Sequence, residues 1–171
     1  MSSNYTQAAV LSEALASSYG EGDLRLDAYF KPADKNGYRF SQKSGKDFRC
    51  SFRVGEMYLN SAEAAAQSDK LPQARTRLLE LMQKRYTPEA YAAKVTAVNA
   101  MNKETLIQEI LNERTRELAF EGHRWFDLRR TTRPRIEKVL KGGTYVLEQD
   151  DQRYTIQIPR EAIAANPELS N

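Results

Sequence analysis

The stretch ERTRELAFEGHRWFDLRR, residues Glu113 to Arg130, decides the fold because its residues repeat with helical spacing and an unusually large share of them is charged. Its charged side chains surround apolar ones, and it holds the only tryptophan and the only histidine of the chain, Trp125 and His123. Three interpretations follow: a catalytic cluster, a basic surface for an acidic partner, or an unusually polar part of the core.

A catalytic or metal-binding cluster would use the three carboxylates of this stretch. Glu113, Glu117 and Glu121 recur every four residues and therefore share one face of a helix. A di-iron site needs Glu-x-x-His motifs on paired helices, whereas His123 follows Glu121 beyond a glycine and has no counterpart. The HExxH, Walker and G-x-S-x-G motifs are absent as well. The sequence therefore predicts a protein that is not an enzyme and has no catalytic residue, metal or cofactor, although a hydrolase built from separated carboxylates stays open.

The structural interpretation accounts for more of these residues. Arg114 falls in the apolar stripe of the helix, four residues from Leu118. A guanidinium in that position must be paired, because an uncompensated buried charge is costly. Glu117 and Glu121 are within its reach, and His123 is expected to be structural. The stretch therefore predicts an ion-pair network beneath the end of a helix.

The composition is that of an ordinary soluble protein with one domain. Of the 171 residues, 40% are hydrophobic and 29% are charged, which suffices for one core. The net charge of +3 is small and the two signs are interleaved, so no nucleic-acid partner is expected. No apolar run has the length of a transmembrane helix, and this chain alone is expected to be soluble. Cys50 is the only cysteine, so it forms no intrachain disulfide and lacks the companions of a zinc site.

Helical periodicity predicts a mainly α protein. Helices are expected over Tyr5–Ser18, Arg53–Gln67, a stretch beginning at Pro72, Lys103–Glu121 and Arg124–Arg130. The buried face of the second is expected to carry Val54, Met57, Tyr58, Ser61, Ala62 and Ala65. Small Ala62 and Ala74 would let two helices approach closely, as in a tetratricopeptide-type hairpin. Thr87-Pro88 is typical of a helix start, but residues 91–101 could be helix or loop.

Two further segments are predicted to contain strands or irregular structure. Pro134 and Gly142-Gly143 bound an expected linker helix, after which the alternating runs YVLEQ and RYTIQI predict a small C-terminal β-hairpin around Asp150-Asp151. Residues 19–48 are rich in glycine, aspartate and aromatic residues, and predict an irregular segment with one short strand near Tyr38–Ser41. Its aromatics either cover a core or stack on a sugar; the candidates are Tyr29, Phe30, Tyr38 and Phe48.

Three stretches carry a family resemblance: FRVGEMYLNSAEA (Phe52–Ala64), ERTRELAFEGHRWFDLRR, and IQIPREAIAANPEL (Ile156–Leu169). In this order they resemble the C-terminal region of the SusD/RagB family, and GDLRLDAYF (Gly22–Phe30) looks like the D-x-R segment that precedes them. The resemblance implies one domain over residues 1–171. Its parts would be an N-terminal helix and irregular segment (1–51), a helical core (52–130), and a linker, hairpin and tail (131–171).

The resemblance also implies a function. Such proteins are surface-exposed outer-membrane lipoproteins of Bacteroidota that capture oligosaccharides or other nutrients and pass them to a SusC-like TonB-dependent transporter. Their membrane association comes only through the lipid anchor of the full-length protein, and this chain resembles a C-terminal part or a compact member. Tyr29, Phe30 and Tyr38 are the candidate ligand contacts, and the alternative function is a tetratricopeptide-like scaffold that binds proteins and no small ligand. The family positions expected to be scaffold are Glu56, Tyr58, Glu63, Glu113, Arg114, Glu117, Glu121, Trp125, Asp127 and Arg129.

Overall fold

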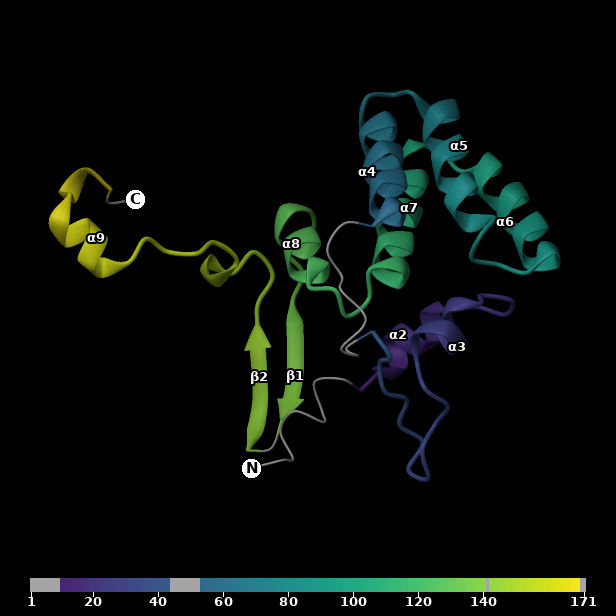
Figure 1. Ribbon diagram of the computed structural model, residues 1–171. Helices are drawn as coiled ribbons and strands as arrows, with labels where there is room; N and C mark the ends of the chain where they lie inside the picture. The colour runs from purple at the N-terminus through teal and green to yellow at the C-terminus, as the bar shows by residue number, and fades with distance from the viewer. Residues whose placement is uncertain (1–9, 44–52, 141, 170–171) are drawn as a thin grey trace. The chain divides into compact units, whose positions relative to one another are not determined.

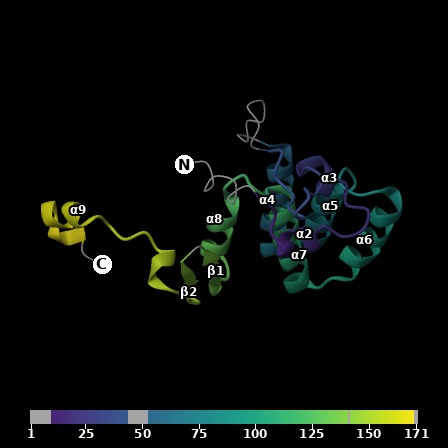
Figure 2. The ribbon, with the colours of Figure 1, turned by 90° about the horizontal axis from the view of Figure 1, so that it is seen from below.

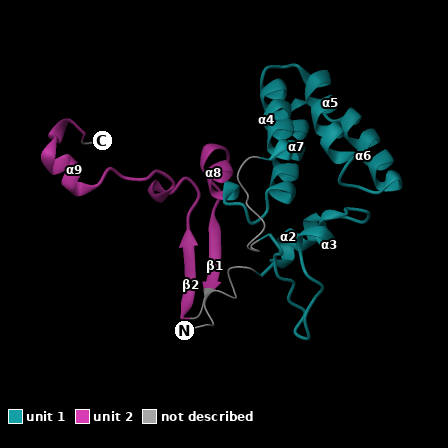
Figure 3. Ribbon diagram, in the orientation of Figure 1, with its two compact units in different colours: residues 1–124 teal, residues 125–171 magenta. Residues whose placement is uncertain are grey.

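The computed structural model describes residues 10–43, 53–140 and 142–169. The chain divides into two compact units, Met1–Arg124 and Trp125–Asn171 (Figure 3). The predicted helix over residues 5–9, the aromatic Phe48 and the thiol of Cys50 lie outside the described residues.

The first unit is built on four helices that pack side by side (Figures 1 and 2). Helix α4 packs against both α5 and α7, and α6 packs against α5. The predicted helical hairpin is the α4–α5 pair, and α6 and α7 extend it into a layer of helices. Their bounds are Val54–Gln67 for α4, Leu71–Met82 for α5, Pro88–Ala100 for α6 and Lys103–Glu117 for α7.

Local signals set the helix starts. The Thr87 hydroxyl accepts a hydrogen bond from the Ala90 amide, so the predicted start at Thr87-Pro88 is confirmed. Residues 91–100, which the sequence left open, continue this helix. The Asn102 side chain caps α7 by accepting from the Thr105 amide. Helix α7 ends at Glu117, four residues before the predicted end, and Phe120 and Gly122 follow with positive φ angles of 63° and 84°.

The core of this unit lies where α4, α5 and α7 meet. Its fully buried members are Leu59, Ala62, Ala66, Ala74, Leu78, Met82, Val98, Leu106 and Ile110. The predicted buried face of α4 is wrong at Val54 and Met57, whose side chains are 72% and 51% exposed. Because α4 contacts α7 as well as α5, its buried arc is centred on Leu59 and Ala62 instead.

The N-terminal part of the unit contains two short helices, α2 (Glu13–Ser18) and α3 (Arg25–Tyr29). Within the described part of the predicted Tyr5–Ser18 helix, Val10 forms a β-bridge with Phe40 and Ser12 caps α2, so residues 10–12 are not helical. The predicted strand at residues 38–41 is not continuous and consists of isolated bridges, Val10 to Phe40 and Phe30 to Ser41.

The second unit contains the only sheet among the described residues. Strands β1 (Ile136–Leu140) and β2 (Gly143–Leu147) pair antiparallel, with Ile136 opposite Leu147 (Figure 1). The predicted linker helix is therefore wrong: that segment is β1, and positive φ angles at Gly142 and Gly143 let the chain turn back. The RYTIQI run is not a strand, since Asp151 instead caps a 3₁₀ turn, Gln152–Tyr154. The fold class is confirmed as mainly α with a small C-terminal two-stranded sheet.

Helix α8 (His123–Arg130) spans the boundary between the units, and α9 (Arg160–Ala165) and a 3₁₀ turn (Pro167–Leu169) follow the sheet. Within the second unit the Trp125 ring stacks on Tyr154, with centroids 5.1 Å apart and planes 8° from parallel. The Tyr154 hydroxyl donates to the Pro134 carbonyl oxygen. In the part of the chain that the structure describes, no helix is both long and apolar enough to cross a membrane.

Candidate functional site

The charged stretch that decides the fold forms a buried ion-pair network. Glu113 and Glu117 have no exposed surface. Arg25 Nη1 lies 2.8 Å from Glu113 Oε1, at an angle that makes it a charge contact and not a hydrogen bond. Arg116 Nη2 donates to Glu113 Oε2 over 2.7 Å. Arg25 is itself held by Asp23, which accepts from its Nε and Nη2 over 2.9 and 2.7 Å.

The predicted network is thus present, and it includes partners that the sequence did not indicate. Arg114 is buried in the helix face as predicted, yet it donates to Asn60 Oδ1 over 2.6 Å. The Glu117 carboxylate is bound by arginines from distant segments, namely Arg25, Arg53 and Arg85. Burial by itself raises the pKa of Glu117, but hydrogen bonding to Arg85 and the surrounding positive charges lower it overall. Both carboxylates are enclosed and paired with arginines, which suits a structural role.

Tyr29, the first predicted ligand contact, belongs to the edge of this network. Its hydroxyl accepts from Arg53 Nη2 over 3.0 Å, and Lys43 Nζ lies 3.7 Å from the centre of its ring. Lys43 also donates to Glu121 Oε1 over 2.6 Å, and Glu121 pairs with Arg53. Burial raises the pKa of Tyr29. The side chain is half-buried, and a cation occupies one face of its ring.

Phe30, the second predicted contact, lies in the core. Its side chain is 0% exposed and packs edge-to-face against Tyr19 and Phe120, with centroids 5.8 and 5.7 Å away. The ring offers no face to a ligand, because it lies in a buried cluster with Leu11, Tyr19 and Ala119. The expectation that Phe30 stacks on a sugar is therefore corrected.

Tyr38 is the predicted aromatic that opens to solvent. Its side chain is 54% exposed, and a tight turn presents it: Asp34 Oδ1 accepts from the Asn36 and Tyr38 amides, and Gly37 has a φ of 82°. The ring borders a hollow of about 570 Å³. Other residues lining this Tyr38 hollow include Leu11, Ser12, Glu13, Ala16 and Arg39.

The chemistry of the Tyr38 hollow suits a polar ligand with an apolar face. An exposed ring supplies a stacking surface, while Glu13 and the Arg39 guanidinium, which is 2.9 Å from Asp27 Oδ1, supply hydrogen-bonding groups. Its volume falls within the range of about 300–1,000 Å³ that is usual for small-molecule sites.

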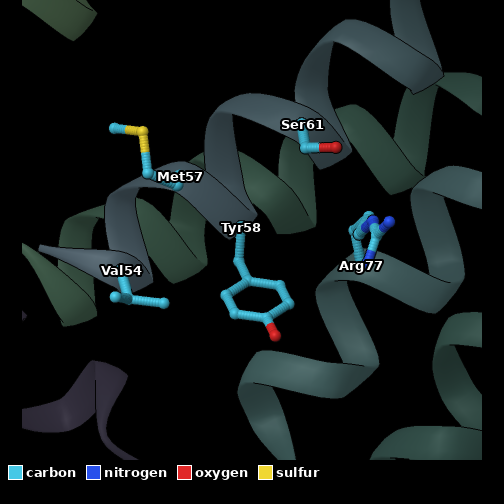
Figure 4. A pocket seen from close by; sticks show the side chains of 5 residues that line it. All are labelled: Val54, Met57, Tyr58, Ser61 and Arg77. Atoms are coloured by element: carbon cyan, nitrogen blue, oxygen red, sulfur yellow. The ribbon is translucent and has the colours of Figure 1, made fainter.

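Two other hollows lie on the same unit. One, of about 620 Å³, borders α2 and α7 and is lined by residues that include Ser12, Ser18, Asn112, Thr115, Arg116 and Arg124. The other, of about 210 Å³, lies between α4 and α5 (Figure 4). There Val54, Met57, Tyr58 and Ser61 project from α4 and Arg77 projects from α5.

The remaining scaffold candidates have structural positions. Glu56 and His123 face each other, with Oε1 and Nδ1 3.8 Å apart, and Tyr58 and Glu63 are half-buried on α4. In the second unit Trp125 stacks on Tyr154, and buried Asp127 accepts from Arg130 Nη2 over 2.7 Å. The Arg129 carbonyl accepts from Arg133 Nε. Among the described side chains, no group of three or more His, Cys, Asp or Glu is placed to hold a metal ion.

Several residues of these sites escaped the sequence interpretation. Arg85 carried a signal, since it continued the apolar stripe of α5 and a guanidinium there needs a partner. Asp23 and Arg25 stood in the D-x-R segment without an assigned contact. Ser12, Glu13 and Arg39 carried no signal, because the Tyr38 hollow forms only when α2 and the turn at Asp34 come together.

Comparisons with known proteins identify the family to which this chain belongs. The sequence model of the SusD family matches residues 17–171. A solved SusD-like carbohydrate binding protein from Bacteroides vulgatus ATCC 8482 has a similar fold, with a TM-score of 0.62, at 19% sequence identity. The superposition covers 92% of this chain but 40% of that one, so this chain spans less than half the length of its solved relative. No curated protein matches the sequence. Because the family match extends over most of the chain and the fold agrees with it, this chain belongs to the SusD family.

Proposed function

We propose that this chain is part of a non-catalytic nutrient-binding lipoprotein that captures a glycan at the outer membrane of a Bacteroidota cell. Glycan capture would precede delivery to a SusC-like TonB-dependent transporter, and the lipid anchor of the full-length protein would hold it at the cell surface. Membership of the SusD family supports this proposal, as does the carbohydrate-binding description of the solved relative.

The observation that carries the proposal is the exposed Tyr38 ring at the edge of a hollow of about 570 Å³. Glu13 and Arg39 lie in the same hollow and supply groups that hydrogen-bond sugar hydroxyls. A binding role without catalysis agrees with the carboxylates of the charged stretch, since Glu113 and Glu117 are buried in ion pairs and cannot reach a ligand.

Thermal melts of the chain with a panel of neutral oligosaccharides test the proposal, because a ligand that binds the native state raises the midpoint. We expect at least one glycan to raise it, and Tyr38→Ala to remove that shift. The matched control is Tyr145→Ala: Tyr145 has a similar exposure of 58% but lies on β2, in the other unit. A shift that survives Tyr38→Ala would exclude the Tyr38 hollow as the site.

A second candidate function is a scaffold that binds proteins. The observation that favours it is the surface between α4 and α5, where exposed Val54 and Met57 lie beside Tyr58 (Figure 4). Apolar side chains grouped in a hollow on a helix pair are typical of a protein contact. This alternative predicts that no oligosaccharide of the panel shifts the midpoint of either the unmodified chain or Tyr38→Ala.

A further inference from the structure

The charges that line the Tyr38 hollow do not balance. Glu13 and Arg39 are the charged side chains among the described residues that line it. Arg39 Nη1 lies 2.9 Å from Asp27 Oδ1, so the positive charge of Arg39 already has a partner. Asp27 is not among the described lining residues, and the charge that the hollow presents to a ligand is therefore the negative charge of Glu13.

The Glu13 carboxylate is accessible. The residue is exposed and lies in the first turn of α2. Among the residues that the structure describes, none forms a hydrogen bond or an ion pair with its side chain. Lys31 and Lys35, on the segment that carries Tyr38, are exposed and do not line the hollow. A negative charge in the first turn also stabilises a helix, but this effect needs no direct bond and leaves the carboxylate oxygens for a ligand.

An aromatic ring beside a carboxylate suits a cation. The face of a tyrosine ring attracts an ammonium group, and a carboxylate accepts charge-assisted hydrogen bonds from the same group. The exposed Tyr38 ring and Glu13 supply both features in one hollow. Its volume of about 570 Å³ lies in the range of sites for ligands larger than one sugar ring, so a sugar stacked on Tyr38 leaves room for a substituent that reaches Glu13.

We infer that the glycan contains an amino sugar: one ring stacks on Tyr38, and a protonated amine of that ring or of its neighbour binds the Glu13 carboxylate. This inference rests on the proposed function, because it adds a charge requirement to the same ligand. The group required is a free amine, since the amide of an N-acetylated sugar carries no charge.

Titration calorimetry of the chain with two tetrasaccharides tests the inference. Cellotetraose and the corresponding glucosamine tetrasaccharide share their linkage and differ in one substituent of each ring, a hydroxyl group in the first and an amine in the second. The buffer is mildly acidic, so that the amines carry a proton. We expect the glucosamine tetrasaccharide to bind on the order of fivefold more tightly, and this advantage to shrink as salt is added.

Glu13→Gln should lower the affinity for the glucosamine tetrasaccharide by a similar factor, to about that of cellotetraose. The matched control is Glu89→Gln. Glu89 is likewise exposed and lies in the first turn of a helix, α6, so the change removes the same charge from the same kind of position outside the hollow. We expect this control to keep the advantage.

Tetralysine separates a sugar site from a site for any cation, because it carries ammonium groups without sugar rings. We expect it to bind more weakly than the glucosamine tetrasaccharide. Equal affinities for the two tetrasaccharides, an advantage that survives Glu13→Gln, or equally tight binding of tetralysine would overturn the inference. The proposed function fails separately, and only if the neutral panel also leaves the melting midpoint unchanged.

Discussion

Arg85 binds both carboxylate oxygens of Glu117, with Nε 2.8 Å from Oε2 and Nη2 2.8 Å from Oε1. The same carboxylate accepts from Arg53 Nη2 over 2.9 Å and lies 3.3 Å from Arg25 Nη1. These arginines belong to α3, to the residue before α4 and to the segment after α5, so three separate parts of the first unit converge on the last residue of α7. The Glu117 carboxylate therefore links α3 to the ends of α4, α5 and α7 through charge, in addition to the apolar core that α4, α5 and α7 share.

Replacing Glu117 by Gln should destabilise the protein strongly. The substitution keeps the size of the side chain but leaves Arg25, Arg53 and Arg85 without their shared negative charge. Removing one partner of a buried ion pair typically costs about 3–5 kcal/mol, because the remaining charge stays desolvated. Urea denaturation followed by circular dichroism measures this free energy of unfolding.

The control for that measurement is Glu80→Gln. Glu80 pairs with Arg77 over 2.8 Å on the surface of α5, and both side chains are about two-fifths exposed. Such pairs contribute about 0–1 kcal/mol. If both substitutions lowered the free energy of unfolding equally, the network would not be the link that the structure indicates.

Glu117 should also make the stability sensitive to acid. Its pKa in the folded state is lower than its ordinary value of 4.5, since the three arginines outweigh the effect of burial. Below pH 4.5 the Glu117 carboxylate therefore binds a proton in the unfolded chain but stays ionised in the folded chain until the pH reaches its lower, folded-state pKa. The contribution of Glu117 to stability is complete above pH 4.5 and is lost as the pH falls through the folded-state pKa. The free energy of unfolding should decrease between about pH 5 and pH 3 more steeply in the unmodified chain than in Glu117→Gln. Parallel curves for the two proteins would contradict this assignment.

Gly55→Ala should destabilise α4, against the usual effect of this change. Within a helix, replacing Gly by Ala commonly gains about 0.5–1 kcal/mol. At Gly55 the added Cβ would lie 2.6 Å from Glu117 Oε1, and that oxygen cannot move because arginines hold it. We expect the free energy of unfolding to fall by about 1–3 kcal/mol, as measured by urea denaturation.

A double-mutant cycle separates this clash from any other cause. In a Glu117→Ala background the obstructing carboxylate is gone, so Gly55→Ala should become neutral or stabilising. If Gly55→Ala lowered the free energy of unfolding by the same amount in that background, the cause would lie elsewhere in α4 and not at the Glu117 carboxylate.

The sequence predicted the helices and the existence of the ion-pair network because both leave local traces. Periodicity over α4, α5 and α7, the Thr87 cap and an arginine in an apolar stripe can each be recognised within a few turns of helix. The partners could not be recognised, since Arg25 and Glu117 are 92 positions apart and nothing local relates them. The exposed position of Val54 and Met57 also depended on an unseen contact, that of α4 with α7.

The candidate site was predictable in kind but not in detail. An aromatic-rich irregular segment indicated a ligand surface, but whether a ring points inward or outward depends on the chain around it. Phe30 pairs with Ser41 across a β-bridge and packs inward, whereas Tyr38 follows the turn at Asp34 and stays exposed. Similarly, the linker segment after Pro134 formed a strand because Gly143–Leu147 was available to pair with it.

The Trp125–Tyr154 stack makes it possible to follow the second unit alone. Trp125 is the only tryptophan of the chain, so its fluorescence reports on the second unit, while circular dichroism reports mainly on helices α4 to α7 of the first. Tyr154→Ala removes the stacked ring and the hydrogen bond to the Pro134 carbonyl. We expect it to lower the midpoint of the fluorescence melt by at least about 5 °C while the circular dichroism melt changes little.

Tyr145→Ala, at an exposed position on β2, controls for the loss of a tyrosine and should shift neither melt. If Tyr154→Ala instead shifted both signals together, the two units would unfold as one cooperative body. In that case the stack would stabilise the helical layer as well, because a perturbation confined to the second unit can reach the circular dichroism signal only through coupling between the units.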